Sequence, residues 1–310
     1  MKNKNIVVLM GGPSTEREVS LNTGKAILDA LLEKGYRAVG VEIDPPRLVE
    51  QLREQNCDIV FNAMHGMYGE DGRLQGALEL SGIAYTGSGV LASAIAINKA
   101  TTKQMFIAAG ITTPRSKTYR KREGSAVIID DILNDFSTPV VVKSSSQGSS
   151  IGVTIVEDPS ELKSAIEDSF VYDEEILVEE FIKGKELTVA VWGNEKPEAL
   201  PIIEITTRSG RYDYRSKYTK GESEHLVPAP LSDEVTKRVQ DMAVRAFVAL
   251  SCCGVARVDF MLSEDEIPYA LEVNTVPGMT STSLVPDAGR AAGIEFPDMC
   301  ERILQMAINK

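Results

Sequence analysis

The first hundred residues alternate apolar runs with amphipathic stretches, and this alternation restricts the possible folds more than any other feature of the chain. The apolar runs predict strands and are "IVVLM" (6–10), "RAVGVEI" (37–43) and "CDIVFNA" (57–63). Helical periodicity covers 16–32 and 48–54. Alternating strands and helices predict an open, Rossmann-like parallel sheet with crossover helices. Ligands of such sheets bind beyond the carboxyl ends of the strands, where the turns "GGPSTEREVS" and "HGMYGEDG" fall.

Two further α/β units follow, so we expect the 310 residues to form three units. A helix that ends at Gly110, with Pro114 after it, marks the passage into the second unit. That unit contains the strand "PVVVK", a helix over 159–170 and the strand "EILVEEFI". The third unit begins at "GKELTVAVWG". Its irregular segment over 206–230 has the length of a lid or binding loop. A helix near 233–250, a strand pair and two short helices follow that segment. We place the units at 1–98, 99–184 and 185–310.

Composition excludes several classes of protein. A net charge of −12 argues against a general affinity for nucleic acid or acidic membranes, which bind clustered Lys and Arg. No apolar run approaches the roughly 20 residues that span a bilayer, and the first apolar stretch is too short for a signal peptide. The four cysteines lack CxxC spacing and predict reduced thiols in a cytoplasm. Two histidines are too few for a histidine-rich zinc site.

The turn after the first strand does not have the pattern of a common nucleotide site. It lacks G-x-G-x-x-G, and Val19 stands where a P-loop that ends at Gly24 and Lys25 needs its first glycine. Glu16 lies near the start of the following helix, where a carboxylate interacts favourably with the helix dipole. From the turn alone, that stabilising role is sufficient to explain Glu16.

The segments "ARVDFML" and "YALEVN" indicate a hairpin that gathers oxygen ligands. Because side chains alternate along a strand, Glu272 and Asn274 share one face, and Asp259 on the neighbouring strand can share it. The same alternation directs Leu271 and Val273 to the core. Carboxylate and amide oxygens suit Mg²⁺ or Mn²⁺ that also binds phosphate. The alternative, solvated acids on an exposed face, does not account for this gathering of charge on one side.

The segment "VVVKSSSQGSSIGV" predicts a flap over phosphate. Lys143 ends an apolar strand, and a turn rich in Ser and Gly follows before the next strand. This arrangement directs an ammonium and backbone N–H groups towards phosphate oxygens. Lys143 precedes Gly148, so the segment is not a P-loop. A flexible linker is the alternative, but a linker seldom lies between two strands so close in sequence.

Six segments occur in the order seen in D-alanine–D-alanine ligases of the ATP-grasp superfamily, and the chain resembles that family along nearly its whole length. They are "GGPSTEREVSLNTG", "HGMYGEDGRLQG", "NKATTKQ", "KSSSQGSSIGV", "YDYRSKY" and "ARVDFML…LEVNTVPGMTSTSLVP". The resemblance implies an ATP-grasp fold with ATP between the second and third units. It places two D-alanines between the first and third.

The resemblance also implies a reaction. The carboxylate of the first D-alanine attacks the γ-phosphate of ATP, which gives an acyl phosphate and ADP. The amine of the second D-alanine then attacks the acyl carbon and expels phosphate. The product, D-alanyl-D-alanine, would feed peptidoglycan precursor synthesis in a bacterial cytoplasm, and a homodimer is expected from the family.

The family's ATP-binding residues match positions in the second and third units. Two magnesium ions, or manganese, would neutralise the β- and γ-phosphates. The matching metal ligands are Asp259, Glu272 and Asn274; the phosphate lysines are Lys99 and Lys143; the segment at adenine and ribose contains Glu179, Phe181, Ile182 and Glu186.

The family's substrate-binding residues match positions in all three units. By this resemblance Glu16 pairs with the ammonium of the first D-alanine, so the opening turn binds an amino acid. The other matches are Arg257 and the N–H of Gly278 at the oxyanion, Ser283 and Lys217 at the second carboxylate, and Ser149 and Tyr218 as the partners of Glu16 that hold the long loop closed. His65 matches a histidine near the first substrate, with a role in proton transfer or orientation.

Three positions bear on specificity and on the flap. Related ligases that form D-alanyl-D-lactate generally lack tyrosine at the position of Tyr218, so a second D-alanine is favoured over D-lactate, and D-serine stays open. Many members have proline and a charged residue where this chain has Ser144 and Gln147, which predicts a more mobile flap or weaker phosphate binding.

Other functions remain as alternatives at this point. One is a D-alanyl-D-lactate ligase or another ATP-grasp carboxylate–amine ligase. A second is a non-catalytic nucleotide-binding or amino-acid-sensing protein, which loss of the metal ligands or of Arg257 would have favoured. A third, a nicotinamide oxidoreductase, is weakened by the missing dinucleotide fingerprint.

Overall fold

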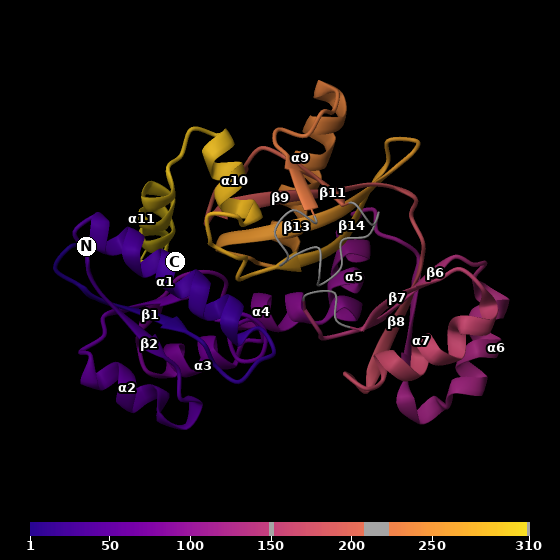
Figure 1. Ribbon diagram of the computed structural model, residues 1–310, viewed down its shortest axis with the longest axis horizontal. Coiled ribbons are helices and arrows are strands. Elements are labelled where there is room, and N and C mark those ends of the chain that lie inside the picture. Colours follow the sequence, from indigo (N-terminus) through magenta and orange to yellow (C-terminus); the bar gives the residue numbers. More distant parts are fainter. Residues whose placement is uncertain (149–151, 208–222, 309–310) are drawn as a thin grey trace.

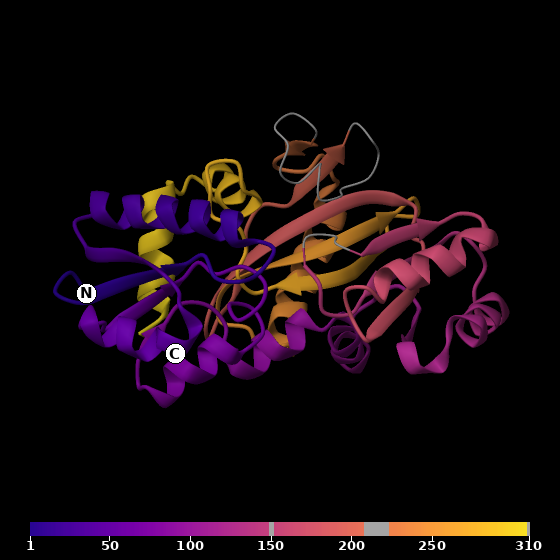
Figure 2. The ribbon, with the colours of Figure 1, turned by 60° about the horizontal axis from the view of Figure 1, so that its bottom comes forward.

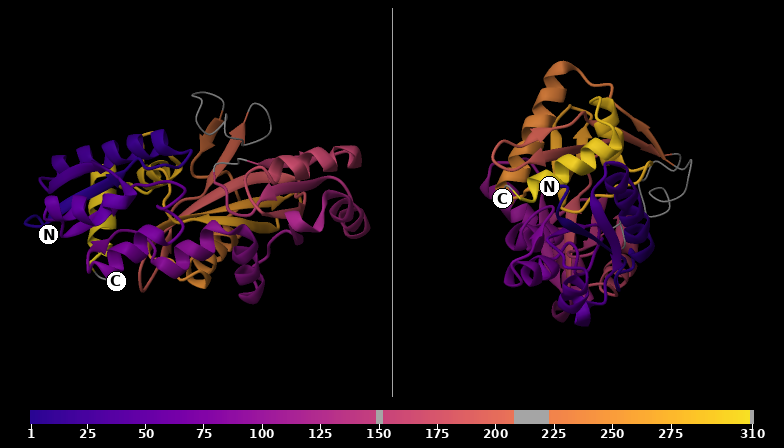
Figure 3. Two further views of the ribbon diagram at one scale, coloured as in Figure 1. Left: turned by 90° about the horizontal axis from the view of Figure 1, so that it is seen from below. Right: turned by 90° about the vertical axis from the view of Figure 1, so that its left-hand side faces the viewer.

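The structure is a computed structural model, and it describes residues 1–148, 152–207 and 223–308. Three sheets lie in a row, with the third between the other two (Figure 3). The described residues form one parallel and two antiparallel sheets with helices, which confirms the α/β prediction.

The first sheet is parallel, which confirms the prediction from the alternating pattern. Its order is β2-β1-β3-β4, with β1 at Asn5–Met10, β2 at Arg37–Glu42, β3 at Ile59–Asn62 and β4 at Ala84–Tyr85. The connecting helices are α1 (Arg17–Glu33), α2 (Leu48–Glu54) and α3 (Arg73–Leu80). The middle of β1 is fully buried because helices cover both faces of such a sheet.

The second sheet is antiparallel and forms the opposite end of the molecule (Figure 1). Its order is β5-β8-β6-β7, with β5 at Ser116–Arg120, β6 at Val140–Ser144, β7 at Val153–Val156 and β8 at Glu175–Glu180. Two helices, α6 (Ser125–Asp135) and α7 (Leu162–Ser169), pack against each other and share one hydrophobic core with it. The pairing of β6 with β7 agrees with the two strands expected on either side of the flap.

The third sheet carries the long hairpin. Its main path is β12-β11-β9-β13-β14, and β10 pairs with β9. The strands are β9 (Gly184–Gly193), β10 (Glu198–Ala199), β11 (Ile203–Thr207), β12 (Ser223–Leu226), β13 (Gly254–Ser263) and β14 (Pro268–Asn274), and α9 (Asp233–Ala249) packs on them. The expectation that all of 206–230 is irregular is wrong at both ends: Thr206 and Thr207 belong to β11, and Ser223–Leu226 pairs with β11 at the sheet edge.

A β-bulge in β14 decides which residues face the core. Asp259 pairs with Glu272, but the next residue of β13, Phe260, pairs with Ala270, so Leu271 is an extra residue. The bulge reverses the alternation. Ala270 and Val273 are both buried in the core, whereas Leu271 is only half-buried, and the expectation that it points to the core is wrong.

The last two helices join the third sheet to the first unit. They are α10 (Leu284–Ala291), which packs against β9, and α11 (Phe296–Met306), which lies against α1 (Figure 2). Lys34 after α1 forms ion pairs with Asp298 and Glu301 of α11, at 2.6 and 2.9 Å. Two other helices, α4 (Val90–Ile97) and α5 (Lys99–Ala108), pack against β14. None of the helices in the described part of the chain has the length and apolar character that crossing a membrane requires.

The close approach of β9 to β13 depends on Gly184. A Cβ at this position would lie 1.8 Å from the carbonyl oxygen of Leu262. Gly184→Ala should therefore lower the free energy of unfolding by about 1–3 kcal/mol, the usual cost of overpacking. Urea unfolding of the variant and of wild type measures this difference in the free energy of unfolding. Gly76→Ala is the matched control, because the nearest atom to its Cβ is 3.9 Å away and alanine is favoured in a helix by about 0.5–1 kcal/mol. Equal stabilities for the two variants would contradict the packing.

Candidate functional site

Contacts between side chains and main chain join the three sheets around one site. The turn after β6 reaches the first sheet, because a Cβ on Gly148 would lie 3.1 Å from Oε2 of Glu16. The same turn reaches α5, whose Lys99 donates a hydrogen bond to the carbonyl of Gln147 at 2.6 Å. Lys99 also pairs with Glu272 of β14 at 3.3 Å. The structure thus brings together residues predicted from four separate segments.

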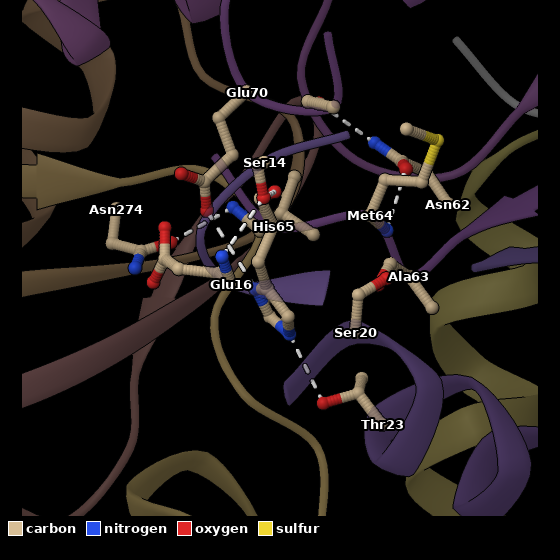
Figure 4. A network of polar contacts seen from close by, with 12 residues as sticks. Ser14, Glu16, Ser20, Thr23, Asn62, Ala63, Met64, His65, Glu70 and Asn274 are labelled. Atoms are coloured by element: carbon tan, nitrogen blue, oxygen red, sulfur yellow. Dashed lines mark hydrogen bonds and ion pairs between the residues drawn. The ribbon is translucent and has the colours of Figure 1, made fainter. Parts of the chain in front are cut away.

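The turn after β1 holds Glu16 at the start of α1. Glu16 is 9% exposed, and its N–H donates to Ser14 Oγ, which donates to the carbonyl of His65. Gly66 follows with φ +70°, and a Cβ there would lie 2.9 Å from the Glu16 carboxylate. The polar network of this cluster extends to Asn274 in Figure 4. A buried carboxylate beside main chain at the carboxyl ends of β1 and β3 fits a small cationic group.

His65 is fixed by groups on both sides of its ring. Nε2 lies 3.0 Å from Thr23 Oγ1, and Nδ1 lies 3.8 Å from Oε1 of Glu70. Burial raises the pKa of Glu70, and the charge of Glu16 adds to the increase although His65 opposes it. His65 is therefore held in one orientation between α1 and the turn that follows β3.

The predicted metal ligands share one face of β13 and β14. Arg257 pairs with Asn274, and Asp259 with Glu272, in the register of the hairpin. The guanidinium of Arg257 donates two hydrogen bonds to Asp259, at 2.8 and 2.7 Å. Thr188 of β9 donates to the same carboxylate at 2.6 Å. All these side chains lie opposite the buried Val258 and Phe260.

The donor set of this face fits magnesium only together with a phosphate. Asp259, Glu272 and Asn274 supply hard oxygen ligands. No group of three or more His, Cys, Asp or Glu side chains that could hold a metal occurs within the described ranges. An ion bound by two carboxylates and an amide takes its remaining ligands from substrate oxygens, as Mg²⁺ does in nucleotide sites.

A buried charge cluster occupies the end of the second sheet. Lys143 of β6 lies 2.6 Å from Oε2 of Glu179, and Lys103 of α5 lies 2.8 Å from Oε1. Burial by itself would raise the pKa of Glu179, but the fields of Lys143 and Lys103 hold it below its usual value. Both oxygens of Glu179 therefore lie beside an ammonium group, one from the second sheet and one from α5.

Some of the remaining predicted site residues lie in the described part of the chain, and the others do not. Gly278 lies beside Ser283, since a Cβ on Gly278 would be 3.0 Å from Ser283 Oγ. Ser283 Oγ also accepts from the N–H of Thr280 at 3.0 Å. Half-buried positions after β8 and in β9 are Phe181, Ile182 and Glu186. The predictions for Ser149, Lys217 and Tyr218 lie outside the described residues.

Sequence reasoning missed three residues of the site. Glu70 lies in the turn "HGMYGEDG" after β3. Lys103 lies four residues after Lys99, on the same face of α5. That i, i+4 spacing was the available signal for Lys103. Thr188 carried no signal, because its contact with Asp259 depends on the pairing of β9 with β13.

Comparisons with known proteins agree along the chain. Family models described as D-ala D-ala ligase N-terminus and C-terminus match residues 44–88 and 105–305. A D-alanine–D-alanine ligase from Desulforamulus reducens is 47% identical, over 98% of this chain and 99% of the relative. The crystal structure of such a ligase from Bacillus anthracis complexed with ATP has a TM-score of 0.86 at 35% identity, over 99% and 98% of the two chains. The VanG D-Ala:D-Ser ligase from Enterococcus faecalis has a TM-score of 0.85 at 31% identity, over 98% and 99%.

The raised pKa of Glu70 predicts a dependence of stability on pH. The folded state favours the protonated carboxyl, so the contribution of Glu70 is complete below the ordinary pKa of 4.5 and is lost as pH rises through the folded value. The Glu70→Gln variant should not show this loss. Its free energy of unfolding minus that of wild type should therefore increase as pH rises above 4.5, by about 1.4 kcal/mol for each unit by which folding raises the pKa of Glu70. Urea unfolding from acid to neutral pH tests this, with the exposed Glu33→Gln as control. Parallel curves for Glu70→Gln and wild type would disprove it.

Proposed function

The chain belongs to the D-alanine–D-alanine ligase family and is an ATP-dependent ligase, and we propose that it forms D-alanyl-D-alanine at the site where the three sheets meet. The observation that supports this most is the face of β13 and β14, which carries two carboxylates and an amide: Glu272 pairs with Lys99, and Asn274 lies in the polar network of Glu16 and His65 (Figure 4). The product would serve peptidoglycan precursor synthesis.

The reaction has to activate a carboxylate, because a carboxylate anion is a poor electrophile. An oxygen of the first D-alanine attacks the γ-phosphorus of ATP, the bond to ADP breaks, and D-alanyl phosphate forms. The amine of the second D-alanine attacks the acyl carbon, loses a proton, and displaces phosphate together with the carboxylate oxygen. The site has to hold both amino acids against the nucleotide during these steps.

The phosphates of ATP would be held by side chains from two elements. Lys99 of α5 and Lys143 of β6 are the proposed ligands of the α- and β-phosphates, and both ammonium groups already lie close to carboxylates of the site. Asp259, Glu272 and Asn274 would hold two Mg²⁺ or Mn²⁺ ions, which neutralise charge on the β- and γ-phosphates when bound.

The nucleoside would lie along the segment after β8. Main-chain atoms near Phe181 and Ile182 would bind the adenine edge, and Glu186 would accept from the ribose hydroxyls. Glu179, which lies between Lys143 and Lys103 at this end of the sheet, would face the base.

The amino acids would bind at the carboxyl end of the first sheet. Glu16 would accept from the ammonium of the first D-alanine, a charge-assisted contact of roughly 1.5–3 kcal/mol. Its neighbour His65 would orient that substrate or move a proton. Arg257 and the N–H of Gly278 would stabilise the oxyanion, which is the task that preorganised donors perform best. Ser283 beside Gly278 would contact the second carboxylate.

Other features of the proposal come from the family and from the needs of the reaction. Lys217 would assist at the second carboxylate, and Ser149 and Tyr218 would close the loop with Glu16 and shield the acyl phosphate from water. We propose the units 1–98, 99–184 and 185–310 as domains, a homodimer as the assembly, and the bacterial cytoplasm as the location because the reaction consumes ATP.

The similarity to a D-Ala:D-Ser ligase supports a second candidate, with D-serine as the second substrate. The Lys217-Tyr218 pair favours D-alanine by the family pattern.

Measurement of phosphate release with ATP and Mg²⁺ separates these functions. D-alanine is offered alone and together with D-serine or D-lactate, and L-alanine is the negative control. The products are identified by mass spectrometry. Release that requires D-alanine, with D-alanyl-D-alanine as the main product, supports the proposal. A mixed dipeptide or an ester as the main product would change the specificity, and no release from folded protein would refute the ligase.

The metal assignment predicts the effect of removing one charge. Glu272→Gln keeps the size of the side chain but weakens an ion-binding ligand, so D-alanine-dependent ATP turnover should fall by about 10²–10³-fold, the range for one electrostatic contact in a transition state. The control is Glu264→Gln, since Glu264 is exposed at the hairpin turn and pairs only at the surface with Lys183. Near-normal turnover by Glu272→Gln would refute the metal assignment.

A further inference from the structure

Lys103 is a buried cation that the proposed reaction does not use. Its side chain is 2% exposed, among the largest that are fully buried in the described chain. The ammonium lies 2.8 Å from Glu179 Oε1 and donates to Thr113 Oγ1 at 2.7 Å and to the carbonyl of Pro114 at 2.8 Å. Three oxygens therefore surround the three protons. Burying an ion is costly even when it is paired, so stability alone does not explain this lysine.

The cluster around Glu179 has more positive than negative charge. Lys143 pairs with one oxygen of the carboxylate and Lys103 with the other. A single pair of Lys143 with Glu179 would be neutral, and its field on a phosphate would be weak. Because Lys103 shares the carboxylate, Glu179 does not fully neutralise Lys143 at the end of β6, where Lys143 would meet a phosphate.

Lys103 also connects the nucleotide end of the site to the metal-binding strand. Thr113, which accepts from Lys103, donates to the carbonyl of Ala270 at 2.8 Å. The N–H of Ala270 in turn donates to the carbonyl of Thr112. Ala270 lies at the bulge of β14, two residues before Glu272. One chain of contacts thus runs from Lys143 through Glu179 and Lys103 to the strand that carries Glu272.

We propose that Lys103 is a positioning residue for ATP, which keeps Glu179 from neutralising Lys143 and fixes the second sheet against β14. The inference rests on the proposed function in one respect, the contact of Lys143 with a phosphate. Lys103 itself touches neither substrate nor metal in this arrangement.

The charge of Lys103 can be removed by pH as well as by mutation. Burial lowers the pKa of Lys103 to about 8, against the field of Glu179, and Lys143 adds to the decrease. The charged groups that act on it are Glu179 and Glu180 of β8 and Lys143 of β6, while Thr113 and Pro114 contribute neutral oxygens. Affinity for nucleotide should therefore decrease as pH rises above about 8.

The experiment compares Lys103→Met with Lys117→Met. Lys117 is a partly exposed lysine of β5 in the second sheet and pairs with Asp131 and Asp135. The dissociation constant of MgADP from calorimetry and the KM for ATP are measured between pH 7 and 9.5, together with the KM for D-alanine. We expect Lys103→Met to weaken nucleotide binding by about 10–100-fold, the range for loss of a supporting contact, and to leave the KM for D-alanine unchanged. The pH dependence of wild type should be absent in Lys103→Met and present in Lys117→Met.

Several results would overturn the inference. Unchanged nucleotide affinity in folded Lys103→Met would reduce Lys103 to a structural role, whatever the change in thermal stability. If the variant does not fold, nucleotide affinity of wild type that stays constant from pH 7 to 9.5 would overturn it. Calorimetry with MgADP does not depend on ligation, so failure of wild type to form D-alanyl-D-alanine would refute the proposed function and still leave Lys103 tested.

Discussion

The site depends on the pairing of β13 with its two neighbours. Every residue of β13 pairs with β9, and β14 covers the other side, so the strand cannot rotate or slip without moving its core face to the site. This register places Arg257 and Asp259 opposite a core that contains Val258 and Phe260. The bulge at Leu271 then reverses the alternation of β14, so that the core residue Ala270 and the proposed metal ligand Glu272 lie two positions apart.

Ion pairs hold the charged side chains of the site in place. Asp259 is held by Arg257, Glu272 by Lys99, and Glu179 by two lysines. Buried charges are costly when alone, and each of these pairs places opposite charges together. Lys99 and Lys143 are the proposed phosphate ligands, and Asp259 and Glu272 are proposed metal ligands. Binding of ATP with its metal would therefore give these four groups new partners of opposite charge.

The sequence predicted the parts of the fold that depend on local pattern. Apolar runs and helical periodicity indicated the parallel sheet, and strand alternation indicated that Glu272 and Asn274 share a face. The bulge at Leu271 could not be predicted, because an extra residue leaves no mark on the hydrophobic pattern. The burial of Lys103 could not be predicted from its helix, because its partners Glu179, Thr113 and Pro114 all lie outside α5. The packing of α11 on α1 is likewise set by tertiary contacts between the two ends of the chain.

In the proposed reaction ATP activates the carboxylate of one D-alanine before the amide bond forms. The sharpest test uses D-alanine labelled with ¹⁸O in the carboxylate and mass spectrometry of the phosphate released in ordinary water. One ¹⁸O should pass from the carboxylate to phosphate for each dipeptide, because the acyl phosphate breaks between carbon and that oxygen. Formation of the dipeptide with unlabelled phosphate would show that no acyl phosphate is formed.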